Sequence, residues 1–212
     1  MSRSLPPHFE EDQKFVLPPV DTFASSVKGG TFIVTGSNTG LGFEAAQSLV
    51  RLGASKVILA VRTISKGEEA QSKIEAETGI QGTTEVWALD MSNYQSVIDF
   101  AQKVKTLDRV DGVIENAGIA LAHWSVGDKG VETTLIVNVT GTVLLAALLL
   151  DTLKESAQKH GIQPHLSIVG SGVALQDNAR DELNKAPESE NIIQYFSDES
   201  HGIESMYAPF SV

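Results

Sequence analysis

Residues 35–42 are Thr35-Gly36-Ser37-Asn38-Thr39-Gly40-Leu41-Gly42; they follow the apolar run Thr31-Phe32-Ile33-Val34 and precede a helical pattern at residues 43–52. A strand, a glycine turn and a helix start in this order are typical of a phosphate site. The first glycine can take the tight turn, the second lets backbone approach a pyrophosphate, and the third permits close helix–strand packing. We therefore expect a dinucleotide-binding loop. Its predicted cofactor-binding residues are Gly36, Ser37, Asn38, Gly40, Leu41 and Gly42.

Strand-like runs alternate with helix-length segments along the first 170 residues. The runs rich in β-branched residues are 31–35, 56–61, 84–88, 112–115 and 166–169. The helix-length segments between them are 44–52, 66–78, 93–105 and 132–160. Such alternation implies right-handed crossovers and a parallel sheet. The sequence therefore predicts an α/β fold, a doubly wound parallel sheet of the Rossmann type, with the ligand crevice at the carboxyl ends of the strands.

Composition and charge limit the classes of partner. The chain has 212 residues and 42% hydrophobic content, enough to bury one sizeable core. Its formal net charge of −11 disfavours nucleic acid or an anionic membrane as the main partner, because both need clustered Lys and Arg. There is no cysteine, which excludes disulfides and thiolate zinc sites, and the five histidines lack metal-ligand spacing. We expect no bound metal.

The amino-terminal segment and the apolar stretches indicate where in the cell the protein is expected. Residues 1–28 carry scattered charges and prolines, without an apolar core of signal-peptide length. The longest apolar stretch, residues 143–150, is far shorter than a membrane span. We therefore expect a cytoplasmic protein that binds no membrane.

The spacing T-G-x-x-x-G-x-G differs from the common G-x-G-x-x-G and resembles that of the short-chain dehydrogenase/reductase family. Further segments resemble landmarks of that family in the same order, and they are residues 56–62, 89–91, 116–118, 137–141 and 167–171. The resemblance implies an N-terminal extension at 1–28 and a dinucleotide-binding Rossmann domain at 29–175. Residues 176–212 are then an acidic, irregular tail with a remnant of the substrate region.

Members of this family normally continue with further strands that complete the sheet, and this chain resembles a C-terminally truncated member. The run 166–169 should therefore be an exposed edge strand unless the tail or another chain covers it. The family commonly pairs through the helix that here spans residues 135–153. An apolar patch on that helix would mark an interface, so we expect a homo-oligomer.

The resemblance assigns the other cofactor contacts. Arg62 follows the second strand beside the expected adenine ribose, where a guanidinium suits a 2′-phosphate and favours NADP(H); the alternative is a solvated arginine. Lys66 adds charge there or is an ordinary exposed helix residue. Asp90 accepts a hydrogen bond from the adenine amino group or simply closes a turn, and Met91 lines the ring's pocket. Asn116-Ala117-Gly118 lets the cofactor ribose lie near backbone.

The resemblance also implies the residues for catalysis. Ser171 matches the serine that orients and polarises a substrate carbonyl. Asn138 matches a helix asparagine that helps hold a water in the proton relay; taken alone, such an asparagine is more often a structural hydrogen bonder. The family's tyrosine acts with a lysine four residues on, which lowers the phenol pKa. Tyr207 is the best positional match, but Ser211 stands four residues on and Pro209 breaks the helix.

These residues predict an NADP(H)-dependent oxidoreductase that acts on a carbonyl or alcohol group of a small-molecule substrate. One alternative is a non-catalytic, truncated relative that binds cofactor or a partner, or that catalyses a cofactor-dependent non-redox reaction. Another is an incompletely folded product of a misread coding sequence. The incomplete relay favours the alternatives, whereas the full set of landmarks in the amino half favours the enzyme.

Overall fold

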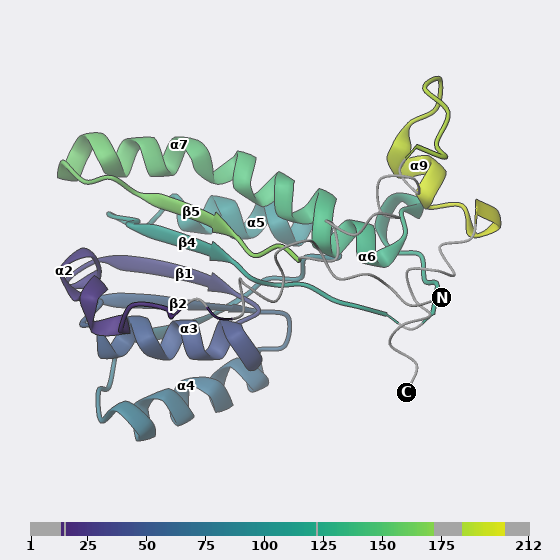
Figure 1. Cartoon of the computed structure of the whole chain (residues 1–212). Coiled ribbons are helices and arrows are strands. Elements are labelled where there is room, and N and C mark those ends of the chain that lie inside the picture. The colour runs from purple at the N-terminus through teal and green to yellow at the C-terminus, as the bar shows by residue number, and fades with distance from the viewer. Residues whose placement is uncertain (1–13, 15, 122, 172–183, 202–212) are drawn as a thin grey trace.

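Five parallel strands form one sheet (Figure 1). The structure, a computed structural model, describes residues 14, 16–121, 123–171 and 184–201. The strands are β1 (Thr31–Thr35), β2 (Lys56–Val61), β3 (Thr84–Ala88), β4 (Gly112–Glu115) and β5 (His165–Ile168). They are ordered β3-β2-β1-β4-β5, and all neighbouring pairs are parallel. The strand order reverses direction between β1 and β4, which confirms the predicted doubly wound sheet.

Four long helices cover the two faces of the sheet. They are α3 (Gly40–Arg51), α4 (Ile64–Thr78), α5 (Tyr94–Val104) and α7 (Thr142–His160). Figure 1 shows α3 and α4 on one face, with α5 and α7 on the other. This arrangement leaves the carboxyl ends of the strands open between the layers at the β1–β4 switch point, where ligands of such folds bind.

The two faces of the central strand pack into separate hydrophobic clusters. Successive residues of a strand point to opposite faces. Val34 accordingly packs with Phe43 on the α3–α4 side, whereas Ile33 packs with Leu145 on the α5–α7 side. All five residues of β1 are buried. Burial on both faces explains why the strands read as continuous apolar runs in the sequence.

The long helix predicted before the fifth strand is interrupted near its start. A short helix, α6 (Thr133–Leu135), leads into a π-helical turn, η3 (Ile136–Gly141), and α7 follows. The turn approaches the β3–α5 loop closely, because a Cβ on Gly141 would lie 2.5 Å from the carbonyl oxygen of Met91. Turns of this kind occur frequently at functional sites, and this one contains Asn138.

The helical run of residues 133–160 is long and apolar enough to cross a membrane by length and composition. In the fold, however, Leu145, Leu149 and Leu153 of this run are buried in the cluster between α5, α7 and the sheet. One side of this run is therefore packed in the fold, whereas Val143 and Leu150 on its other side are 59% and 48% exposed.

Further short helices precede β1, lie between β4 and β5, or follow β5 in the chain. They are η1 (Val20–Phe23), α2 (Ala24–Val27), η2 (Asp128–Gly130), α9 (Ile192–Phe196) and η5 (Glu199–His201). The N–H of Glu132 donates to the hydroxyl of Ser197 at 3.0 Å, which holds the residues after α9 beside the start of α6 (Figure 1). Part of the segment expected to be an irregular tail is therefore helical and attached to the domain.

β5 is at the edge of the sheet. Within the described residues it pairs only with β4. Ile168 and Val169, at its carboxyl end, are 51% and 49% exposed. This agrees with the exposed edge expected for the fifth strand.

Candidate functional site

The glycine loop after β1 provides an anion site. Gly36 and Gly40 have φ angles of 64° and 58°, which glycine adopts without strain. The helix α3 begins at Gly40, and its N-cap residue, Thr39, makes no side-chain capping bond. The first N–H groups of α3 are therefore left for a bound anion.

One threonine joins the ends of β1 and β4 beneath this loop. The hydroxyl oxygen of Thr35 accepts hydrogen bonds from the N–H groups of Asn116 at 3.0 Å and Ala117 at 2.9 Å. Asn116 Nδ2 donates to the Thr35 carbonyl oxygen at 3.1 Å. A Cβ on Gly36 would lie 2.9 Å from the Ala117 Cα, and one on Gly42 would lie 2.5 Å from the Gly36 carbonyl oxygen. Loop, helix and β4 turn therefore pack at backbone distance.

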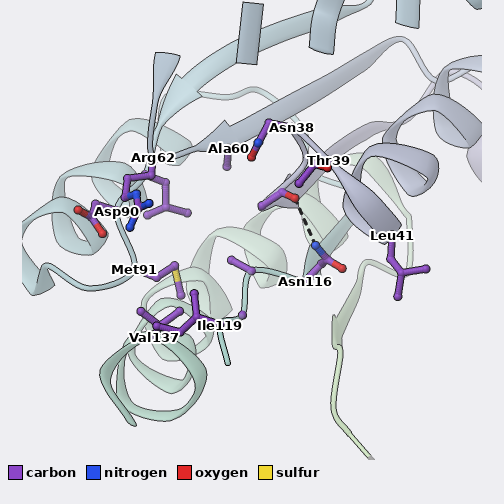
Figure 2. Close-up of a pocket in the computed structure, with 14 residues that line it drawn as sticks. Asn38, Thr39, Leu41, Ala60, Arg62, Asp90, Met91, Asn116, Ile119 and Val137 are labelled. Carbon is purple, nitrogen blue, oxygen red and sulfur yellow. Dashed lines mark hydrogen bonds between the residues drawn. The ribbon is translucent and has the colours of Figure 1, made fainter. Parts of the chain in front are cut away.

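A hollow of about 390 Å³ opens at the carboxyl ends of the strands (Figure 2). This volume is within the range of small-molecule sites. Its lining residues are Gly36, Asn38, Thr39, Leu41, Ala60, Arg62, Leu89, Asp90, Met91, Asn116, Ala117, Gly118, Ile119 and Val137. The structure thus brings most of the predicted cofactor residues into one hollow. Ser37 is in the adjoining loop, Gly40 and Gly42 are in the first turn of α3, and Lys66 lies elsewhere.

Ser37, predicted as a cofactor contact, lies beneath the surface of this loop. It is fully buried, and its hydroxyl has no hydrogen-bond partner among the described residues. It does not line the hollow. The groups of this loop that face a ligand are therefore the glycine turn and the first N–H groups of α3.

Arg62 and Asp90 lie at the same end of the hollow (Figure 2). Arg62 is the exposed residue directly after β2. Asp90 Oδ1 accepts hydrogen bonds from the Ser92 N–H at 2.9 Å and the Ser92 hydroxyl at 2.6 Å. Asp90 therefore closes a turn, which was the alternative to a contact with the adenine amino group. It also borders the hollow. Met91 is buried beside it and supplies an apolar surface.

Lys66 lines a second hollow of about 330 Å³, formed by residues of α3, α4 and the glycine loop. Asn38 and Thr39 border both hollows. Lys66 therefore does not line the same hollow as Arg62.

Asn138 holds the wall of the main hollow. Its Nδ2 donates to the Ile119 carbonyl oxygen at 2.8 Å, and its Oδ1 accepts from the Ile119 N–H at 2.9 Å. Both ends of the amide are thus used to fix the segment after the β4 turn. Asn138 was predicted from its residue type, but Ile119 was not, because a contact made by backbone groups leaves no signal in the residue type.

Of the other two residues predicted to act in catalysis, only Ser171 is described. It is exposed and lies three residues beyond β5, at the same edge of the sheet as the hollow. Tyr207 lies outside the described residues.

Glu115, the last residue of β4, is a buried acid that the sequence analysis did not single out. It is 2% exposed, and neither carboxyl oxygen has a hydrogen-bond partner among the described residues. Burial raises its pKa to about 7, because the charged form is disfavoured away from water. The only sequence signal is a carboxylate at the end of an apolar strand, directly before Asn116.

Comparison with known proteins places this geometry in context. The short chain dehydrogenase family model matches residues 30–170. The short-chain dehydrogenase anuD of Penicillium roqueforti (strain FM164) is 46% identical over 163 residues, which are 77% of this chain and 42% of that protein. The chain thus spans less than half the length of this relative.

Two solved structures of short chain dehydrogenases are similar. One, from Shigella flexneri 2a str. 301 and complexed with NADP, has a TM-score of 0.57 at 28% identity and covers 71% of this chain and 62% of that chain. Another, from Escherichia coli CFT073 and complexed with NADPH, has a TM-score of 0.52 at 29% identity and covers 66% and 57%.

The close approach at Gly42 generates a first prediction. Gly42→Ala should destabilise the protein by about 1–3 kcal/mol, because the added methyl group overpacks the Gly36 carbonyl. Thermal melting should show a lower midpoint and a smaller shift on adding NADPH. Gly170→Ala is the control, since a Cβ there meets no described atom within 4 Å. A Gly42→Ala protein with unchanged midpoint and unchanged NADPH shift would contradict the assigned packing.

Proposed function

The chain belongs to the short-chain dehydrogenase family, and on that basis we propose that it binds NADP(H) for oxidation or reduction of a carbonyl or alcohol group of a small molecule. One observation carries the proposal: the hollow at the carboxyl ends of β1, β2 and β4 is lined by the glycine loop on one side and by Arg62 and Asp90 at one end. The bound dinucleotide would supply the hydride that such a reaction transfers.

The proposed preference for NADP(H) over NAD(H) rests on Arg62. A 2′-phosphate accepts charge-assisted hydrogen bonds from a guanidinium, and Arg62 borders the hollow at the end of β2. An acidic residue at this position would instead favour the free 2′-hydroxyl of NAD(H). The similar Shigella and Escherichia proteins were solved with NADP and NADPH, which supports the same choice here.

The chain's own residues have distinct parts in this proposal. The glycine loop and the start of α3 bind the pyrophosphate, and Asn116 and Ala117 hold the β4 turn against Thr35. Asn138 fixes Ile119 in the wall of the hollow. Ser171, at the carboxyl end of β5, orients and polarises the substrate oxygen. Tyr207 is the tyrosine proposed to exchange the proton.

A second candidate function is binding of the cofactor without efficient turnover. None of Tyr94, Tyr195 and Tyr207 has a lysine four residues on. The Tyr94 hydroxyl is hydrogen-bonded to Thr140 Oγ1 at 2.7 Å, and the Tyr195 ring stacks on His201 at 4.0 Å. Two of the three tyrosines thus have structural partners, which favours cofactor binding without efficient turnover.

We further propose that the protein is cytoplasmic. Because its net charge is −11, we also propose that it binds neither nucleic acid nor membrane. Self-association through residues 135–153 is also proposed. Val139, Val143 and Leu150 of this segment are 41%, 59% and 48% exposed and recur at helical spacing. An apolar stripe on an outer helix is typical of an interface.

Replacing Arg62 tests the cofactor preference. Arg62→Ala should weaken NADPH binding by about 10- to 100-fold, since a hydrogen bond to a charged group contributes about 1.5–3 kcal/mol. NADH binding should change little, because NADH has no 2′-phosphate. Isothermal titration with both cofactors measures the difference, and Arg51→Ala, at the exposed end of α3, is the control. Equal losses for NADPH and NADH would refute the preference.

The second candidate function predicts that the purified 212-residue protein shows little or no NADPH-dependent carbonyl reduction, whereas the first predicts robust turnover. Without a neighbouring lysine, a tyrosine keeps a pKa near 10, and loss of general acid–base assistance costs about 10²–10⁴-fold in rate. The assay is oxidation of NADPH with a panel of carbonyl compounds, with Ser171→Ala and Tyr207→Phe as comparisons. Robust turnover that either substitution abolishes would show that a complete relay exists.

Self-association is tested on α7. Wild-type protein should sediment as a dimer or larger, and Val143→Glu together with Leu150→Glu should give monomers, because each buries a charge at the proposed interface. Glu68→Lys, exposed on α4 at the other face of the sheet, is the control. Wild-type protein that sediments as a monomer over a wide concentration range would rule out this interface.

A further inference from the structure

Glu115 points to the face of the sheet that α7 covers. Successive residues of a strand point to opposite faces. Val113 packs in the cluster that contains Leu145 and Leu149 of α7, whereas Ile114 packs in the cluster on the other face. Glu115 therefore lies on the same side as Val113, with its carboxyl group in an apolar layer.

Among the described residues, the groups at the level of Glu115 offer no charge to stabilise a carboxylate. Ile168 of β5 pairs with Glu115 directly, and Thr35 of β1 follows Val34, the partner of Ile114. Neither β1 nor η3 contains a titratable residue. The titratable residues of the other elements in this layer are Tyr94, Asp99 and Lys103 of α5, Asp151, Lys154, Glu155, Lys159 and His160 of α7, and His165 of β5.

These titratable groups lie on outer surfaces or at the opposite end of the sheet. His165 pairs with Gly112, at the start of β4. The carboxyl-terminal part of α7 lies at that same end, because the Ser156 hydroxyl accepts from the Val110 N–H at 3.0 Å. Asp151 has an 82% exposed side chain. Of the α5 residues, Tyr94 is bonded to Thr140 and Lys103 lies over the Trp87 ring.

The residues after Glu115 form the wall of the cofactor hollow. Asn116 and Ala117 donate to the Thr35 hydroxyl, and the Glu115 carbonyl oxygen accepts from the Val169 N–H at 2.9 Å. The end of β4 is thus fixed by hydrogen bonds to both neighbouring strands. A Glu115 carboxylate that moved toward water would displace the same backbone that places Asn116 and Ala117.

We propose that Glu115 is a protonation switch of the cofactor hollow: its neutral carboxyl permits the contacts of Thr35 with Asn116 and Ala117, and its ionised form loosens them. An isolated carboxylate is strongly disfavoured in an apolar layer. The free-energy cost of ionising Glu115 therefore falls when the end of β4 opens to water. The proposal rests on the proposed function only for its ligand, NADPH.

The direction of the switch follows from the raised pKa of Glu115. Its ordinary value is 4.5, and burial raises it to about 7. As pH rises above 4.5, the unfolded chain releases this proton first, so the stability contributed by the neutral folded form declines up to about pH 7. Above pH 7 the folded protein also ionises at Glu115. The closed hollow is therefore favoured below pH 7, and the loosened one above it.

Cofactor titration across pH tests the switch. From about pH 6 to about pH 8.5, the NADPH dissociation constant of the wild type should rise by up to about 30-fold, the limit in which only the neutral form binds. In Glu115→Gln this dependence should flatten. Glu115→Met is a second neutral variant, of similar length but without a buried amide. Glu155→Gln, which removes an exposed carboxylate of α7, should keep the wild-type profile.

Hydrogen exchange of the ligand-free protein separates this proposal from the proposed function. The amides of residues 116–121 should exchange several-fold faster in the wild type than in Glu115→Gln near pH 8, and equally fast near pH 6. If NADPH binds at no pH, the proposed function fails, and exchange alone decides the switch. If NADPH binds but the wild type and both neutral variants share one pH profile of binding and exchange, the switch is overturned.

Discussion

The hydroxyl of Thr35 is the interaction on which the rest of the site depends. It accepts two backbone N–H groups from the β4 turn, and Thr35 is fully buried, so water cannot replace it. Each buried donor left without a partner would cost about 1–3 kcal/mol. The spacing between the first glycine turn and the β4 turn is therefore fixed, with Gly36 against Ala117. The contacts of Thr35 with Asn116 and Ala117 therefore set the width of the hollow between these two turns.

Much of the fold could be predicted because local chemistry determines it. The buried strands carry continuous β-branched runs, and the predicted ranges 31–35 and 56–61 coincide with β1 and β2. The glycine loop was found because a turn with positive φ and backbone-distance packing can be built only with glycine at those positions. The fifth strand begins one residue earlier than predicted, at His165, an exposed polar residue that periodicity does not mark.

Features that depend on tertiary contacts could not be predicted from sequence. The π-helical turn arises where Gly141 approaches the carbonyl oxygen of Met91, some fifty positions away in the chain. Arg62 directly follows β2, whereas Lys66 lies in the first turn of α4. The two residues are only four positions apart, but the change from strand to helix lies between them and they border different hollows. The burial of Glu115 likewise follows from α7 and β5, which pack beside β4 much later in the chain.

The charge of the molecule and the chemistry of the hollow act at different ranges. A net charge of −11 opposes a polyanionic cofactor at a distance; at physiological salt, however, such fields are screened beyond about 8 Å. Inside that distance the first N–H groups of α3 and the Arg62 guanidinium provide donors. Asp90 faces the same end as Arg62, so a 2′-phosphate there gains from the guanidinium and is repelled by the carboxylate. Because the Asp90 carboxylate also accepts two hydrogen bonds from Ser92, part of its charge is compensated within the turn. Under the proposed function, discrimination between NADP(H) and NAD(H) would therefore depend on the attraction of Arg62 exceeding the repulsion by the Asp90 carboxylate.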